Sequence, residues 1–388
     1  MSAHARLAPS SAGRWVPCPG SVQMEERFPD RGDNDASREG TAIHEVAAKV
    51  LQDFLDCGRA GHHFKREDFL DTVASNGVVI TDEMLDVAEV YIRDVLQVSS
   101  RFNGASRVLL EYRVHMPNIH AENWGTLDAA VLFYDTDAQE LVVQDLKAGW
   151  GIVEVWDNWQ LLNYTAGLLQ DMVERNIPLP KTIELRLVQP RPYHREGSVR
   201  VWRFPIAELG SYVERLTASA HEALGAEPRL VTGTHCDNCK ARSACPALLQ
   251  AGYRINETVK GVNPAELKGE SLGKHLSALV EAEKLVKSLR EALEEKALVD
   301  VQQGRPVLGW TWTQKESRVK WDVPAKDVCE LGASMGFDLS KNDAITPKQA
   351  ISAGVPDWLV NSISSSKPAG FKLVPVNLKA IGNIFKQQ

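Results

Sequence analysis

The chain has 388 residues, of which 44% are hydrophobic and 24% are charged, and its formal net charge is −7. These values are typical of a globular protein with two or three domains, and they argue against a broadly basic coat for nucleic acid. No run of about 18 apolar residues occurs, and no apolar segment follows the first residues. We therefore expect a cytoplasmic protein without a transmembrane helix or a signal peptide.

The N-terminal part predicts a rigid turn followed by two helices. Cys18 lies between two prolines, which restrict the backbone there. Apolar residues recur every three to four positions over 40–51 and again over 82–98, which predicts a helix in each range. His44 falls near the apolar face of the first helix, so it is either a half-buried histidine or a metal ligand. Residues 55–80 form a polar loop between the helices.

Three strands are predicted next, over residues 108–114, 124–134 and 141–147. An acidic residue interrupts the apolar run of each strand: Glu111, Asp128 and Asp145. The polar segment 135–139 predicts a hairpin turn, which would bring Asp128 and Asp145 together. Because a buried carboxylate without a partner is costly, two of them beside a lysine favour a bound cation. Glu111 is alternatively a plain residue on an edge strand.

The end of the third strand carries the candidate chemistry. Asp145 and Lys147 are two residues apart and therefore face the same space. A carboxylate and an ammonium group at a strand end can hold a divalent metal and stabilise an anion, although an exposed ion pair is the alternative. Gln160 and Tyr164 follow on a predicted helix, and their spacing of four puts them on one face. They pack, bind a substrate phosphate through hydrogen bonds, or orient catalytic groups.

Two further strands, over 183–189 and 198–204, complete the predicted core, the second at an edge. Then three cysteines follow with C-x2-C-x5-C spacing: Cys236, Cys239 and Cys245. In a cytoplasmic chain such cysteines favour a metal over disulfides. A closed site needs a fourth ligand, and Cys18 or His235 would supply it. Spacing alone leaves zinc, an iron–sulfur cluster and unliganded thiols open.

The order of these motifs resembles that of the PD-(D/E)xK nuclease superfamily. The residues that carry this resemblance are Asp128 and the Asp145-x-Lys147 pair, followed by Gln160-x-x-x-Tyr164 and preceded by Gly40-Thr-x-x-His44 and Glu111. The Gln-x-x-x-Tyr motif, the Gly-Thr-x-x-His motif and Glu111 resemble those of the RecB-type subgroup. The resemblance covers residues 8–250 and implies an α/β fold with a restriction-endonuclease-like core, in which helices flank a mixed central sheet.

The resemblance also implies a function, a Mg²⁺- or Mn²⁺-dependent DNA nuclease, expected to be an exonuclease that acts on DNA ends. It implies that His44, Asp128, Asp145 and the Leu146 carbonyl bind the metal, and that Lys147 acts on the phosphate with support from Gln160, Tyr164 and Glu111. Distant Cys18 with the later triplet is similar to the AddB-type iron–sulfur nucleases, which implies a [4Fe–4S] cluster on Cys18, Cys236, Cys239 and Cys245. Zinc stays the alternative.

The layout further resembles that of phage or prophage nucleases from bacterial hosts, which implies DNA as the partner. A phage recombinase, a single-strand annealing protein or a helicase would work with it, and a homo-oligomer is conceivable. The rival hypothesis is a DNA-binding protein that keeps the nuclease fold without cutting.

Three domains are expected, at residues 1–260, 261–303 and 304–388. Residues 264–301 predict one long helix, which serves as a dimerisation arm or packs on the core. Residues 307–314 and 318–323 predict a hairpin with exposed aromatic side chains, and the serine-rich segment 362–370 predicts a flexible linker.

Overall fold

A computed structural model provides the coordinates of the chain. The residues that it describes are 5–28, 32–57, 64–101, 106–133, 139–259, 264–316, 320–321, 323, 325–339, 346–352, 355–365 and 368–375. The chain divides into two compact units, Met1–Val286 and Lys287–Gln388. Within the described residues, no helix has the length and apolar character needed to cross a membrane.

A mixed five-stranded sheet forms the centre of the first unit, with the strand order β1-β2-β3-β4-β5. The strands are β1 (Ser106–His115), β2 (Trp124–Phe133), β3 (Glu140–Leu146), β4 (Thr182–Val188) and β5 (Val199–Pro205). Neighbouring strands are antiparallel except β3 and β4, which are parallel and are joined through helix α5 (Trp159–Glu174). A parallel pair needs such a crossover because its strands run the same way.

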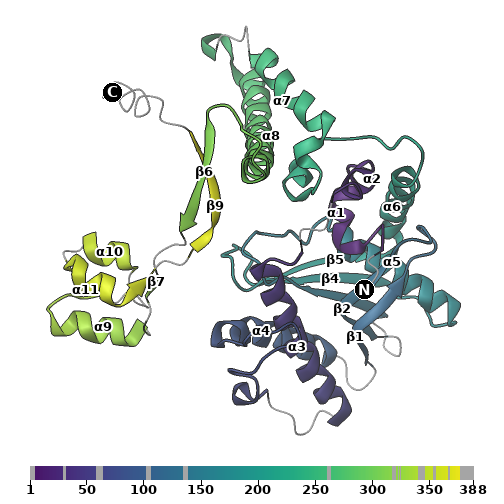
Figure 1. The fold of residues 1–388 in the computed structure, drawn as a ribbon. Helices are drawn as coiled ribbons and strands as arrows, with labels where there is room; N and C mark the ends of the chain where they lie inside the picture. Colours follow the sequence, from purple (N-terminus) through teal and green to yellow (C-terminus); the bar gives the residue numbers. More distant parts are fainter. Residues whose placement is uncertain are drawn as a thin grey trace. The chain divides into compact units, whose positions relative to one another are not determined.

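Helices cover both faces of this sheet (Figure 1). Helices α3 (Asp35–Cys57) and α4 (Asp82–Ser99) pack on one face, and α5 packs on the other with α6 (Leu209–Ala223) and the short α1 (Ala12–Trp15). All residues of β3 are buried, including the polar Glu140, Gln144 and Asp145 on either side of the apolar run 141–143. The predicted α/β class, a mixed sheet flanked by helices, is therefore confirmed.

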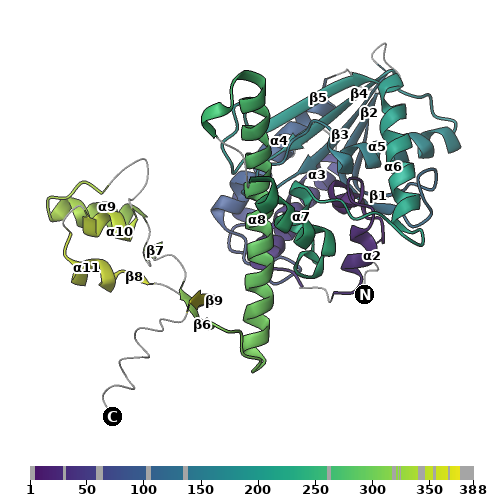
Figure 2. The ribbon, with the colours of Figure 1, turned by 90° about the horizontal axis from the view of Figure 1, so that it is seen from above.

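The remaining elements of the first unit are short or lie after the sheet. They are α2 (Ser21–Glu25), α7 (Pro246–Val259) and six 3-10 turns at Pro9–Ser11, Arg66–Asp68, Ile206–Glu208, Thr234–Asn238, Arg242–Ala244 and Pro264–Glu266. The long helix predicted over 264–301 is α8 (Gly269–Gln302), and the boundary between the two units falls within it. Figure 2 shows the sheet after a turn of 90°, with α5 and α6 beside it.

Among its described residues, the second unit contains two small strand pairs and three short helices besides the end of α8. These elements are β6 (Trp310–Glu316), β7 (Lys320–Trp321), α9 (Ala325–Ser334), α10 (Pro347–Ser352), α11 (Asp357–Ser362), β8 (Ser364–Ser365) and β9 (Pro368–Pro375). Strand β6 pairs with β9, and β7 pairs with β8, both antiparallel. Val328, Leu339 and Val360 lie in a small apolar core.

Two predictions for this unit are wrong. The segments 307–314 and 318–323 do not pair as a hairpin, because each of their strands takes its partner from residues near position 370. The segment 362–370 is not a free linker, since β8 and the start of β9 lie in it. Ser364 is buried, and its hydroxyl donates to the Val360 carbonyl at 2.7 Å. The serine-rich composition suggested a linker, but a serine hydroxyl can form a hydrogen bond to a nearby backbone carbonyl within an ordered segment, as Ser364 does.

Candidate active site

A break in the strand alternation shapes one half of the site. Leu110 pairs with Ala129, and both pack among residues of α3 and α4, whereas Tyr112 pairs with Leu127, and both pack in the cluster of α5. Residues two apart on a regular strand share a face, so the alternation is interrupted between these pairs. The interruption falls at Glu111, whose φ of 42° lies in the left-handed region that non-glycine residues seldom adopt.

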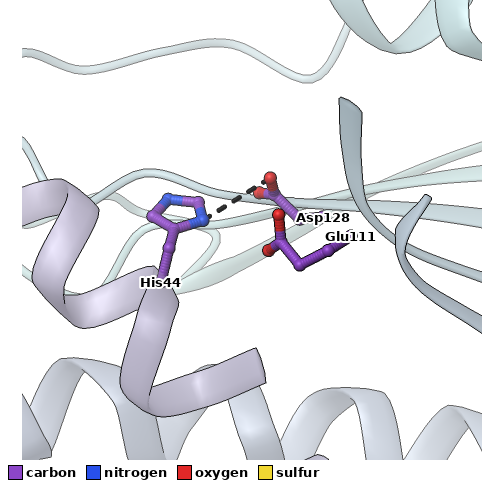
Figure 3. A group of neighbouring side chains, drawn as sticks. All are labelled: His44, Glu111 and Asp128. Atoms are coloured by element: carbon purple, nitrogen blue, oxygen red, sulfur yellow. Dashed lines mark ion pairs between the residues drawn. The ribbon is translucent and has the colours of Figure 1, made fainter. Parts of the chain in front are cut away.

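This break places two carboxylates beside a histidine of α3. His44 Nδ1 lies 3.5 Å from Asp128 Oδ1. One ligand atom from each of His44, Glu111 and Asp128 lies within 4.8 Å of the other two, and Figure 3 shows the three side chains converging from α3, β1 and β2. Imidazole nitrogen and carboxylate oxygen are ligands for divalent metals. The three side chains therefore make a candidate metal site.

Asp128 also connects this group to the end of β3. The ladder between β2 and β3 ends at the pair of Ala129 and Gln144. Beyond that pair, the second carboxylate oxygen of Asp128 accepts a hydrogen bond of 2.7 Å from the backbone N–H of Leu146. A side chain thus takes the place of a strand partner, and it fixes the carboxylate next to the residue between Asp145 and Lys147.

Asp145 and Lys147 form the second half of the site with Gln160. Lys147 Nζ lies 2.9 Å from Asp145 Oδ2, so the two side chains share a face as predicted. Gln160 bridges them, since its Nε2 donates to Asp145 Oδ1 at 2.7 Å and its Oε1 accepts from Lys147 Nζ at 2.9 Å. Asp145 is 3% exposed, and its Oδ2 receives no well-aligned hydrogen bond among the described residues. A buried carboxylate oxygen with only an ion partner is suited to a further cation.

The charged groups of the site lie close together, and this closeness shifts their pKa values. Burial and the nearby Asp128 raise the pKa of Asp145, and Lys147 opposes this. Burial lowers the pKa of Lys147, but the negative charges of Asp145 and Asp128 raise it by more. The pKa of Lys147 is therefore raised, and its amine stays protonated. Glu111 is exposed overall, yet partial desolvation of its carboxylate and the charge of Asp128 raise its pKa to about 7. Such shifts arise where like charges gather in a site.

Tyr164 faces the backbone of β2. Its hydroxyl donates to the Thr126 carbonyl at 2.7 Å, and burial followed by the charges of Asp145 and Asp128 raises its pKa. The hydroxyl therefore stays neutral and ties α5, which carries Gln160, to β2. This geometry suits the orienting role rather than direct contact with a phosphate.

Arg191 is a site-forming residue that the motifs did not indicate. Its guanidinium forms a bidentate pair with Glu39 of α3 and donates to the Ala148 carbonyl at 2.9 Å. It thereby links the start of α3, which bears His44, to the residue directly after Lys147. The parallel pairing of β3 and β4 would have indicated it, because both strands end at one edge of the sheet.

The cysteines lie in two segments that pack against each other. Gly20 donates to the Arg229 carbonyl at 2.9 Å, and Lys240 N–H donates to Glu25 Oε1 at 2.8 Å. The backbone N–H of Val231 points at Cys18 Sγ, at 3.3 Å. The turn that holds Cys18 is thus attached to the segment 229–245, which holds the other three cysteines.

The four thiols influence one another. Burial raises the pKa of Cys18 and of Cys236, and Cys245 is near enough to both to raise them further. Burial raises the pKa of Cys239 to about 12. All four are free thiols, and His235 instead directs Nε2 at the Val231 carbonyl, 2.8 Å away.

The first unit is therefore a mixed α/β protein with an acidic, lysine-containing candidate metal site at one end of its sheet. The chain belongs to the family described as "Protein of unknown function (DUF2800)", whose model matches residues 4–352.

Two solved structures are similar in part. One, from Eubacterium rectale and provisionally described as an exonuclease, is 12% identical with a TM-score of 0.35, covering 66% of this chain and 93% of that one. The other, described as a phage-related exonuclease from Haemophilus somnus 129PT, is 12% identical with a TM-score of 0.22, covering 57% of this chain and 94% of that one. Likenesses of this strength do not assign a function to this chain.

Proposed function

We propose that this protein is a metal-dependent nuclease that cuts DNA, working from DNA ends as an exonuclease. The observation that supports it is the meeting of His44, Asp128 and the Asp145–Lys147 pair at the end of β3. Ligands for a hard cation beside a fixed ammonium group suit hydrolysis of a phosphodiester, whose transition state gains negative charge. The end-dependent mode follows the resemblance of the motifs to RecB-type nucleases.

The donor set fits Mg²⁺ or Mn²⁺ better than a soft metal, because it is rich in carboxylates and has no sulfur. His44, Asp128 and Asp145 would hold the ion together with the Leu146 carbonyl. Glu111 lies close enough to His44 and Asp128 to be a further ligand. When bound, the cation would lower the pKa of a water molecule and polarise the phosphate.

The protein side chains have separate roles in this proposal. Lys147, kept charged by Asp145, stabilises negative charge on the phosphate oxygens. Gln160 fixes both members of that pair, so neither can rotate away. Tyr164 keeps α5 against β2 and so keeps Gln160 in place.

The test compares wild-type protein with Lys147→Ala and Asp145→Asn on linear and covalently closed circular DNA, with Mg²⁺ or Mn²⁺. We expect wild-type protein to degrade only the linear form, and each variant to lose on the order of 10²–10³ in rate. Lys274→Ala, which removes a lysine from an exposed pair with Glu270, is the matched control and should cut normally. Wild-type rates in Lys147→Ala would sink the assignment, and binding without cutting by wild-type protein would favour the non-cutting DNA-binding hypothesis.

For the cysteines we propose a [4Fe–4S] cluster on Cys18, Cys236, Cys239 and Cys245. The distant Cys18 and the spacing of the later triplet, which resemble those of AddB-type nucleases, favour a cluster over zinc. The turn that holds Cys18 is attached to the segment that holds the other three cysteines. Backbone N–H groups also point at the sulfur atoms of Cys18 and Cys236, which stabilises thiolate ligands.

The cluster would join the N-terminal turn to the segment 229–245 and act as a structural staple. Protein purified without oxygen should be brown and contain about four iron atoms per chain by elemental analysis. One equivalent of zinc without iron would overturn the cluster and leave the nuclease proposal standing.

A further inference from the structure

Two loops leave the sheet side by side next to the proposed active site. Because β3 and β4 are parallel neighbours, the segments 147–158 and 189–198 start from the same edge of the sheet. They carry three solvent-exposed aromatic side chains, Trp150, Trp156 and Tyr193, which are 66%, 54% and 89% exposed. Trp150 comes only three residues after Lys147.

The first loop is held in one shape by side-chain hydrogen bonds. Gln189 Nε2 donates to the carbonyls of Gly149 at 2.9 Å and Gly151 at 2.7 Å, and its Oε1 accepts from the N–H of Val153 at 3.1 Å. Arg200 donates to the same oxygen at 2.6 Å. Trp150 is therefore exposed on an ordered part of this loop, which lowers the entropy lost when a ligand binds.

The two loops contact each other and the core. The guanidinium carbon of Arg191 lies 5.9 Å from the centre of the Trp150 ring, and His194 Nε2 lies 3.8 Å from a Glu154 oxygen. Trp156 packs on the buried Trp202 with ring centres 5.5 Å apart. Trp150 and Trp156 thus have supported positions, and each keeps a large part of its surface in solvent.

The chemistry of this surface favours nucleobases. Exposed aromatic faces stack on bases of any sequence, and stacking platforms next to basic groups are how single strands are bound without sequence preference. On the same two loops, Lys147 pairs with Asp145, and the Arg195 guanidinium is 85% exposed beside Glu196, so it is accessible to a phosphate. Neighbouring base pairs cover the base faces inside a double helix, so unpaired nucleotides suit these rings best.

We propose that Trp150, Trp156 and Tyr193 form a stacking surface for the unpaired end of a DNA strand, which directs its backbone to Asp145 and Lys147. This inference rests on the proposed nuclease function. Beyond that function, it states that the DNA strand entering the site is single-stranded at its end and is held through its bases.

The test measures binding without cutting, by fluorescence anisotropy in EDTA. The ligands are a labelled single-stranded oligonucleotide and an oligonucleotide of the same length built of abasic units, which keeps the phosphates and lacks the bases. The variants are Trp150→Ala, Tyr193→Ala and their double mutant. Trp358→Ala is the matched control, since Trp358 is 70% exposed and lies in the second unit.

We expect each variant to bind the normal strand about fivefold or more weakly than wild-type protein does. Affinity for the abasic strand should not change, and the Trp358→Ala protein should bind both like wild type. Unchanged binding of the normal strand, or equal losses on both strands, would overturn the stacking surface and leave it as a docking site for another partner.

The outcomes separate the two proposals. If wild-type protein degrades DNA and the variants bind single strands normally, only the stacking surface fails. If wild-type protein neither binds nor cuts any DNA form, the nuclease proposal fails and the stacking surface fails with it.

Discussion

Replacing Arg191 should loosen the active site without touching its metal ligands. The Arg191 side chain is 7% exposed and that of Glu39 is 32% exposed, so the pair is largely shielded from solvent. A fully exposed ion pair contributes well under about 1 kcal/mol, whereas breaking a fully buried one costs about 3–5 kcal/mol. For this intermediate pair we expect a loss of about 2 kcal/mol in Arg191→Ala, and about 1 kcal/mol more for the lost bond to the Ala148 carbonyl.

This loss should appear in two measurements. The melting temperature should fall by several degrees, given about 2–4 °C per kcal/mol for a unit of this size. Because Glu39 lies in the same helix as His44, the concentration of Mn²⁺ needed for half-maximal cleavage should also rise. Arg191→Lys should recover part of both effects, since it keeps the charge but not the bidentate geometry.

A double-mutant cycle with Glu39→Gln gives the decisive result. If Arg191 acts through Glu39, the effects of the two single substitutions on stability should be non-additive by about 1 kcal/mol or more. Strictly additive effects, together with an unchanged metal requirement in Arg191→Ala, would refute the proposed link between α3 and the end of β3.

Three further predictions concern single features. Tyr164→Phe removes the hydrogen bond to Thr126, so calorimetry should show a melting temperature lower by about 2–4 °C, and an unchanged value would contradict the role in orienting α5. Burial alone would raise the pKa of Glu184, but hydrogen bonds from Arg101 and Arg186 lower it. Ionised Glu184 therefore stabilises the fold above its unfolded pKa of about 4.3, and urea titrations should show this stability disappearing as pH falls below that value, less steeply in Glu184→Gln. Cys18→Ser should lose most bound iron while the protein stays folded; full iron content would exclude Cys18 as a ligand.

The sequence allowed much of the site to be predicted, for physical reasons. Asp145 and Lys147 lie at the end of a strand that is buried on both faces, and such strands have unmistakable apolar runs. Gln160 and Tyr164 were placed on one helix face by spacing alone, and their bonds to Lys147 and the Thr126 carbonyl agree with it. Local periodicity was sufficient because each pair lies within one element.

Other features depended on contacts that periodicity does not encode. Regular alternation would put Asp128 on the same face as Asp145, but the irregular backbone at Glu111 and Asp128 places the Asp128 carboxylate near His44. No glycine or proline marks that break. The pair of Arg191 and Glu39 joins residues 152 positions apart, so only the folded sheet edge brings them together.

The two halves of the site meet at the end of β3, and this arrangement explains why β3 is the element on which the site depends. His44, Glu111 and Asp128 approach its end from the side of α3, and Gln160 with Tyr164 approach it from the side of α5. The Leu146 N–H joins them, because it holds the Asp128 carboxylate next to Asp145 and Lys147. A slip of β3 by one residue would exchange the faces and separate every one of these contacts. Burial of the whole strand therefore stabilises the fold and also fixes the register on which the chemistry depends.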